Sequence, residues 1–146
     1  MRIKIIFFFL LLSILAFPNI LKANSLVDSL YSRLNSISKA ENNLENDTLK
    51  AILLCKISSY IVGSQPTKAY DFLDQAEKII ILHKWEKGQI ILNYYKGFYY
   101  ISIHQHLRAT EYLYRGLSFA EKMNDVIMLG RCYYMLGISY SSLKNF

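Results

Sequence analysis

The sequence predicts an all-α fold in which antiparallel helix pairs stack side by side as an α-solenoid. Tyr60, Tyr100 and Tyr140 stand forty residues apart. Ala69 and Ala109 follow the first two tyrosines by the same nine residues, so the repetition continues beyond a single position. Self-similarity at a fixed period of roughly 20–50 residues is typical of stacked helical units. We therefore divide the chain into about two and a half units, preceded by one further helix.

Unit one, expected over residues 50–83, contains two helices. The first follows Asp47, a good N-cap residue, and ends at Gly63-Ser64-Gln65. Its apolar residues recur at steps of three and four, as one face of a helix requires: Leu49, Ile52, Leu53, Ile57 and Ile61. Pro66 opens the second helix, where its missing N–H costs nothing because that donor has no intrahelical partner. The inward stripe of this second helix is Ala69, Leu73, Ala76 and Ile80.

Unit two is expected over residues 90–123, with helices at 90–103 and 107–123 around a turn at 104–106. Unit three, residues 130–146, contains a first helix alone. In register, Phe146 aligns with Pro66 and His106, the entry to a second helix. We therefore expect a truncated product or fragment whose third unit exposes apolar surface.

Residues 1–23 are predicted to be a secretory signal peptide. Arg2 and Lys4 precede an uncharged apolar block over residues 5–17, and Ala23 stands near a polar boundary. The block is shorter than the roughly 20 residues that a membrane span needs. Leu21 is larger than a cleavage site prefers, so an uncleaved membrane anchor stays open as the alternative. The expected location is periplasmic or secreted, or the inner membrane if the anchor is retained.

Residues 24–46 are predicted to form an amphipathic helix followed by a polar linker. Ser25 is available as a cap, and the apolar face is Leu26, Leu30, Leu34 and Ile37. Because the end of a repeat stack needs a cover, we expect this helix to lie over the first face of unit one.

Charge argues against nucleic-acid binding. Without Arg2, Lys4 and Lys22, fourteen basic residues face eleven acidic ones, and the net charge falls from +6 to +3. The remaining basic residues are scattered among acidic ones, whereas a nucleic-acid site gathers them on one face.

Cys55 and Cys132 are predicted to be free thiols. The unit boundaries place them on helices that are separated by a third helix. Neighbouring helix axes lie about 8–10 Å apart, whereas the Cα atoms of a disulfide lie within roughly 7 Å.

No catalytic or cofactor site is predicted. The sequence shows no paired carboxylate motif, no Ser/His/Asp arrangement and no phosphate-binding glycine loop. His104 and His106 form an H-x-H motif in a turn, but two imidazoles without a third ligand do not make a zinc site. We expect a solvated turn there.

Residues 47–146 resemble the tetratricopeptide repeat (TPR) family. The matching positions are Tyr60, Ala69, Leu73 and Ala76 in unit one, Gly97, Tyr100, Ala109 and Leu113 in unit two, and Tyr133, Leu136, Gly137 and Tyr140 in unit three. Lys56 and Lys96 replace the family's Leu, and we expect their stems to pack while their ammonium groups reach water. The period of forty exceeds the family's thirty-four, which suggests longer helices or linkers. An export signal, a short helix and a TPR stack in this order are similar to the exported N-terminal regions of bacterial sensor proteins. There a membrane helix and a histidine kinase or DNA-binding domain follow.

The resemblance implies a right-handed solenoid whose first helices line a concave groove for a protein or peptide partner. The groove positions implied are Leu54, Ser58 and Ile61 in unit one, Tyr94, Phe98 and Ile101 in unit two, and Arg131, Tyr134 and Ile138 in unit three. Large apolar residues exposed on such a surface mark an interaction site. The other interpretations are that these residues only touch neighbouring helices, or that they would cover a missing downstream segment. Because unit three exposes apolar surface, we also expect the chain to be marginally stable or to associate with itself. A membrane-tethered assembly factor is the alternative function.

Overall fold

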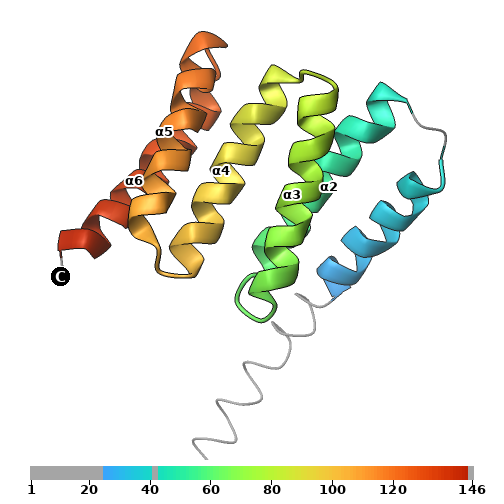
Figure 1. Ribbon diagram of the computed structural model, residues 1–146, viewed down its shortest axis with the longest axis horizontal. Helices are drawn as coiled ribbons and strands as arrows, with labels where there is room; N and C mark the ends of the chain where they lie inside the picture. Colours follow the sequence, from blue (N-terminus) through green and yellow to red (C-terminus); the bar gives the residue numbers. More distant parts are fainter. Residues whose placement is uncertain (1–24, 41–42, 145–146) are drawn as a thin grey trace, which may run out of the picture.

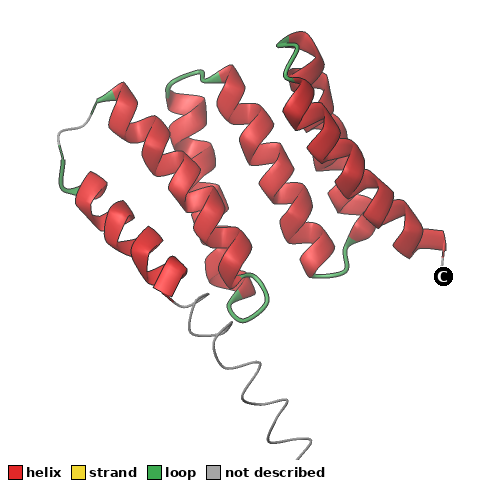
Figure 2. Ribbon diagram, turned by 180° about the vertical axis from the view of Figure 1, so that it is seen from behind, coloured by secondary structure: helices red, strands yellow, loops and turns green. Residues whose placement is uncertain are grey.

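The computed structural model describes residues 25–40 and 43–144, and every regular element within these ranges is an α-helix (Figures 1 and 2). A first helix covers residues 25–38. It is followed by α2 (Leu44–Ile61), α3 (Pro66–Leu82), α4 (Glu86–Ser102), α5 (His106–Lys122) and α6 (Val126–Lys144). The predicted signal peptide, residues 1–23, lies outside the described residues. No helix in the described part of the chain is long and apolar enough to cross a membrane.

The forty-residue period consists of two twenty-residue halves. The helices α3, α4 and α5 each have 17 residues and are joined to the next helix by a three-residue turn. The central residue of each turn is left-handed, with φ of 48° at Lys84, 60° at His104 and 54° at Asn124. The next amide donates to the carbonyl five residues earlier, as from Trp85 to Ile80 at 3.0 Å. This hydrogen bond is the mark of a Schellman C-cap. Because each of these turns has only three residues, the forty-residue period is made up of long helices and not of long linkers.

The start of α2 differs from the prediction. Asn43, not Asp47, caps the helix, because its side chain accepts a hydrogen bond from the Asn46 amide at 2.8 Å. The Asp47 carboxylate instead lies 2.7 Å from Nε2 of His83, just after the end of α3. Asp47 therefore joins the two helices of unit one.

The other boundaries lie close to the prediction. Pro66 is the first residue of α3, as expected. The first helices of units two and three begin at Glu86 and Val126, about one turn earlier than predicted. Cys55 and Cys132 are buried free thiols, which confirms the prediction.

The five helices α2–α6 pack as adjacent pairs with α4 at the centre. α4 contacts α2, α3, α5 and α6, whereas α3 does not touch α5 and α2 does not touch α6. As a result α2, α4 and α6 follow one another through direct contacts. Among these five helices, α3 and α5 each pack only on their neighbours in sequence (Figure 1).

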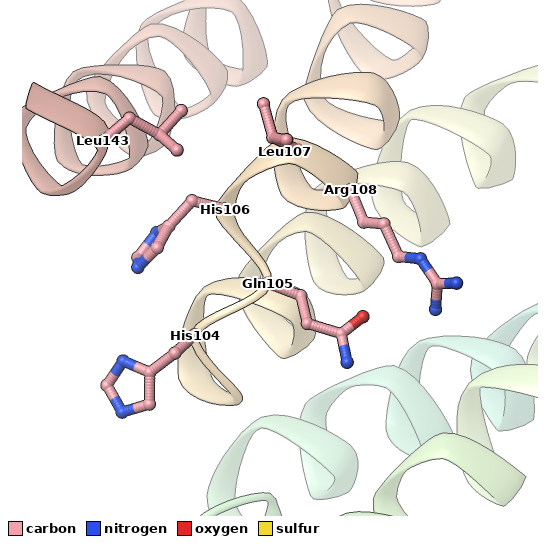
Figure 3. A pocket seen from close by; sticks show the side chains of 6 residues that line it. All are labelled: His104, Gln105, His106, Leu107, Arg108 and Leu143. Carbon is pink, nitrogen blue, oxygen red and sulfur yellow. The ribbon is translucent and has the colours of Figure 1, made fainter. Parts of the chain in front are cut away.

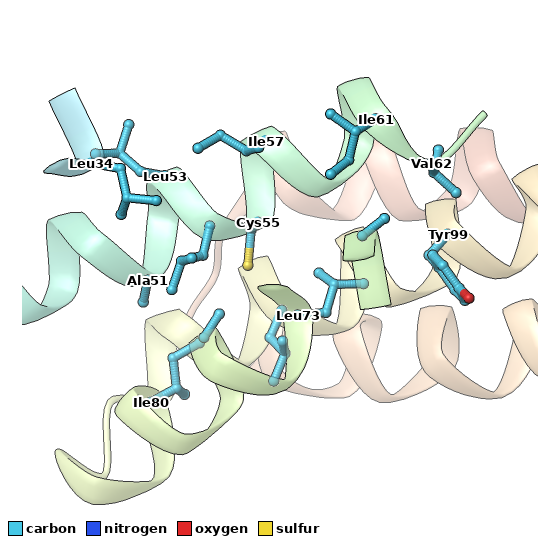
Figure 4. Packing of buried hydrophobic residues seen from close by; sticks show 14 of the residues in the cluster. Leu34, Ala51, Leu53, Cys55, Ile57, Ile61, Val62, Leu73, Ile80 and Tyr99 are labelled. Carbon is cyan, nitrogen blue, oxygen red and sulfur yellow. The ribbon is translucent and has the colours of Figure 1, made fainter. Parts of the chain in front are cut away.

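The helix over residues 25–38 covers α2 and α3, as predicted. Leu34 is 8% exposed and packs in one cluster with Leu53 and Ile57 of α2 (Figure 4). The Tyr31 ring meets Phe72 of α3 edge to face, with ring centroids 6.0 Å apart. The apolar face of this helix therefore extends the main core.

The three tyrosines that define the period have different surroundings. Tyr100 is 7% exposed, whereas Tyr60 and Tyr140 are 52% and 44% exposed. Equal spacing in the sequence therefore does not give equal burial. The Tyr100 ring packs between Tyr70 of α3 and Tyr112 of α5, with ring centroids 6.5 Å and 5.2 Å away.

Candidate protein-interaction surface

The groove positions predicted in unit one are buried. Leu54 and Ser58 are each 1% exposed and Ile61 is 5% exposed. The expectation that they point to an open surface is wrong, because α3, α4 and the helix over residues 25–38 enclose α2. These three side chains stabilise the stack and are not accessible to a partner.

The groove positions predicted in unit two fill the space between first helices. Tyr94, Phe98 and Ile101 are all partly buried. Together with Ile138 of α6 they pack on the core cluster that contains Leu113 and Cys132. The structure thus brings these four of the nine predicted groove residues together. They mainly fill the space between α4 and α6, and each side chain keeps a partly exposed edge.

The groove positions predicted on α6 are the most accessible. Tyr134 is 70% exposed, and Arg131 is also exposed. Tyr134 and Ile138 line a shallow hollow of about 490 Å³ together with Tyr133 and Gly137. This end of the predicted groove is therefore open to solvent.

Tyr95 is a surface candidate that the sequence did not reveal. The pKa of its hydroxyl is raised to about 12, chiefly by burial and also by Cys55, Tyr94 and Tyr60, whereas Arg131 lowers it. Tyr95 of α4 thus lies near Tyr60 of α2 and Arg131 of α6. Positions equivalent to Tyr95 in the forty-residue repeat are 55 and 135. The residues that lie near Tyr95 on the neighbouring helices are Tyr60 and Arg131, so the row across the three helices does not follow equivalent repeat positions. The dense aromatic group on α4 was the signal available in the sequence.

We define the α2–α4–α6 face as Tyr60, Tyr95, Arg131 and Tyr134. It offers three aromatic rings with polar tips and one guanidinium group. Tyr and Arg are enriched among the residues that dominate binding energy, and a tyrosine presents an apolar body together with a hydrogen-bonding end. This chemistry suits an apolar segment that carries a carboxylate or other acceptor.

An ion pair between a buried lysine and a half-buried glutamate lies behind this face. Nζ of Lys96 is 2.7 Å from Oε2 of Glu77 on α3, with side-chain exposures of 4% and 36%. The same ammonium lies 5.3 Å from the centroid of the Tyr112 ring on α5. The expectation that the Lys96 ammonium reaches water is therefore wrong: a carboxylate and an aromatic ring replace its solvent. Lys56, at the matching position of α2, is exposed.

A second hollow, of about 540 Å³, lies at the start of α5 and is lined by His104, His106, Arg108 and Leu143 among others (Figure 3). The expected solvated turn is only partly correct, because His106 is 8% exposed and its ring meets that of His104 edge to face at 6.1 Å. The Arg108 side chain extends the other way, with its guanidinium 5.9 Å from the centroid of the Tyr100 ring (Figure 3). No group of three or more potential metal-ligating side chains occurs in the described part of the chain.

The two thiols should be unreactive in the folded protein. Burial raises the pKa of Cys55 to about 12, despite the opposing charge of Lys96, and burial with Asp125 raises that of Cys132 to about 11. Because the thiolate is the reactive form, Ellman's reagent near neutral pH should modify them about a hundredfold or more slowly than in the unfolded chain. The reaction in concentrated urea is the control. Rapid modification of either thiol without denaturant would contradict the packing described here.

Comparison with protein families, characterised proteins and solved structures found no match for this chain. The functional assignment below therefore rests on the sequence and the geometry.

Proposed function

We propose that this protein is a TPR-like α-solenoid scaffold that binds a protein or peptide segment on the α2–α4–α6 face. The observation that carries the proposal is the contact pattern, in which α4 packs on both α2 and α6 while α3 and α5 do not touch. In a solenoid of helix pairs, the first helices form one continuous wall and the second helices the other. Extended surfaces of this kind are what repeat proteins use for binding.

The accessible residues of this wall set the chemistry of the partner. Tyr60 and Tyr134 are 52% and 70% exposed, and the partly buried Tyr95 lies between the helices that carry them. Arg131 is the cation of the face, because its charge acts on Tyr95. A segment that places apolar side chains on the rings and a carboxylate at Arg131 would satisfy all of these groups.

Export and signalling complete the proposal. The charged and then apolar N-terminus and the forty-residue units support an exported module of a bacterial sensor or regulatory protein. If residues 1–23 stay attached, the chain would instead act as a membrane-tethered assembly factor. Sequencing the mature N-terminus separates the two, because a protein that starts near Asn24 excludes the anchor.

The binding proposal is tested by selecting peptides on the purified protein and measuring their affinity for surface variants. Arg131→Ala and Tyr134→Ala should each weaken binding about tenfold, since hot-spot truncations cost about 1–2 kcal/mol. Arg115→Ala and Tyr114→Ala remove the same two residue types from exposed positions on α5 and should leave binding unchanged. Failure to enrich any peptide, or equal losses in both pairs of variants, would refute the proposal.

A further inference from the structure

One flank of α6 is not covered by any described residue. It consists of Gly130, Tyr133, Gly137 and Tyr140, and the two tyrosines are 57% and 44% exposed. A Cβ atom built on either glycine would meet nothing within 4 Å. The hydroxyl of Tyr140 is already bound to that of Tyr114 on α5, at 3.0 Å. The exposed part of this flank is therefore its ring faces and the bare backbone at the glycines.

The matching flank of α4 shows what such a surface accepts. Forty residues earlier, the corresponding four positions are all buried: Ile90, Asn93, Gly97 and Tyr100. At Gly97 the side chain of Leu113 on α5 occupies the space that a Cβ atom would need. The flank thus accepts an adjacent helix, with a large side chain placed over the central glycine.

On α6 the large and small residues alternate in a way that complements a second copy of the same helix. Consider two antiparallel α6 helices in which Gly137 of one copy faces Tyr133 of the other. The two-fold axis then makes Tyr133 of the first copy face Gly137 of the second. The same axis brings Gly130 opposite Tyr140 in both directions. Each tyrosine ring thus packs over a glycine of the other copy, and all four positions of the flank take part in the contact.

The rest of α6 fits the same register. The charged residues of α6 are Arg131 and Lys144. In this register they come level with Ser139 and Val126, so no like charges meet. The flank itself carries no charge and therefore offers no anchor for a strongly acidic or basic partner.

We propose that two copies of this chain pair α6 against α6, antiparallel about a two-fold axis between Tyr133 and Gly137. This is an isologous interface, in which the same patch serves both partners. Tyr134 lines the same hollow as Tyr133 and Gly137, so pairing would cover one end of the α2–α4–α6 face. Sedimentation in the absence of peptide therefore tests the pairing apart from the peptide-binding proposal. A single helix pair is small compared with the roughly 1,200–2,000 Å² buried by stable interfaces. The dimer therefore dissociates on dilution.

Sedimentation equilibrium of the purified chain over a wide concentration range tests the pairing. The mass should rise from that of a monomer to that of a dimer. Gly137→Asp places a carboxylate and added bulk in the seam and should raise the dissociation constant at least tenfold. Gly63→Asp is the matched control, because Gly63 lies in the turn after α2 and also has nothing within 4 Å of a Cβ atom. A monomer at all concentrations, or a Gly137→Asp variant that associates like the unaltered chain, would overturn the proposal. Either result would leave the flank to a different partner or place self-association elsewhere.

Cross-linking tests the register. A mixture of the Tyr133→Cys and Gly137→Cys variants should give a covalent dimer on mild oxidation, because these positions face each other across the axis. The Tyr133→Cys variant mixed with a Ser141→Cys variant should not, because Ser141 comes level with Leu129 of the other copy. The native thiols are buried and do not interfere. Equal cross-linking in both mixtures, or none in the first, would refute this register.

Discussion

Glu77→Gln should lower the free energy of unfolding by about 3 kcal/mol, the lower end of the cost of breaking a buried ion pair. The Lys96 side chain is only 4% exposed, so the substitution leaves a buried amine without its carboxylate partner. The cation–π contact with Tyr112 at 5.3 Å remains but cannot replace the carboxylate. Urea unfolding followed by far-ultraviolet circular dichroism measures the loss.

Removing the lysine instead should cost less. Lys96→Met leaves a carboxylate that is 36% exposed and can take up water, so we expect a loss of about 1 kcal/mol. In the double variant, an apolar side chain and a neutral amide replace the pair, and stability should return close to that of the unaltered protein. Asp74→Asn is the control, because it breaks the exposed Lys78–Asp74 pair and should change stability little. If Glu77→Gln were no more costly than this control, the ion pair would not be buried as described.

Gly97→Ala should destabilise the protein, although alanine favours a helix. The added Cβ atom would lie 2.6 Å from both Cγ and Cδ2 of Leu113, a fully buried side chain. Such overpacking costs about 1–3 kcal/mol, against a gain of about 1 kcal/mol in helix propensity. We therefore expect a net loss of about 1 kcal/mol and a lower midpoint in urea.

Gly137→Ala is the matched control, forty residues later on α6. Nothing lies within 4 Å of a Cβ atom at that position, so only the helix-propensity gain of about 1 kcal/mol remains. Measured in dilute solution, where the chain is monomeric, the two substitutions should shift stability in opposite directions. Shifts of the same sign would show that Leu113 does not hold the position described over Gly97.

The helices themselves could be predicted from local sequence signals. Pro66 fixes the start of α3, because proline has no amide hydrogen to lose there. Less visible were the turns at Lys84 and His104, since neither residue is the glycine usually found at a left-handed C-cap. At the start of α2, Asp47 was the expected cap. The contact of Asp47 with His83, thirty-six residues away, leaves Asn43 as the cap.

The candidate surface could be predicted only in part. Arg131 and Tyr134 were identified in advance and are exposed. Three positions expected in the groove are buried: Leu54, Ser58 and Ile61. The resemblance assigned the same exposure to every unit, but unit one also packs on the helix over residues 25–38, which lies at the end of the stack (Figure 1). Tyr95 was missed because the row of residues across α2, α4 and α6 is diagonal and does not follow equal positions in the repeat.

The sequence by itself determined the helical class, the forty-residue spacing and the separation of the two thiols, since these depend on periodicity along one chain. Only the tertiary structure decided which tyrosines are exposed, that Lys96 finds a carboxylate instead of water, and which flank of α6 stays open. Those outcomes depend on which helices lie against each other, and a side chain's burial and charge balance are set by neighbours distant in the sequence.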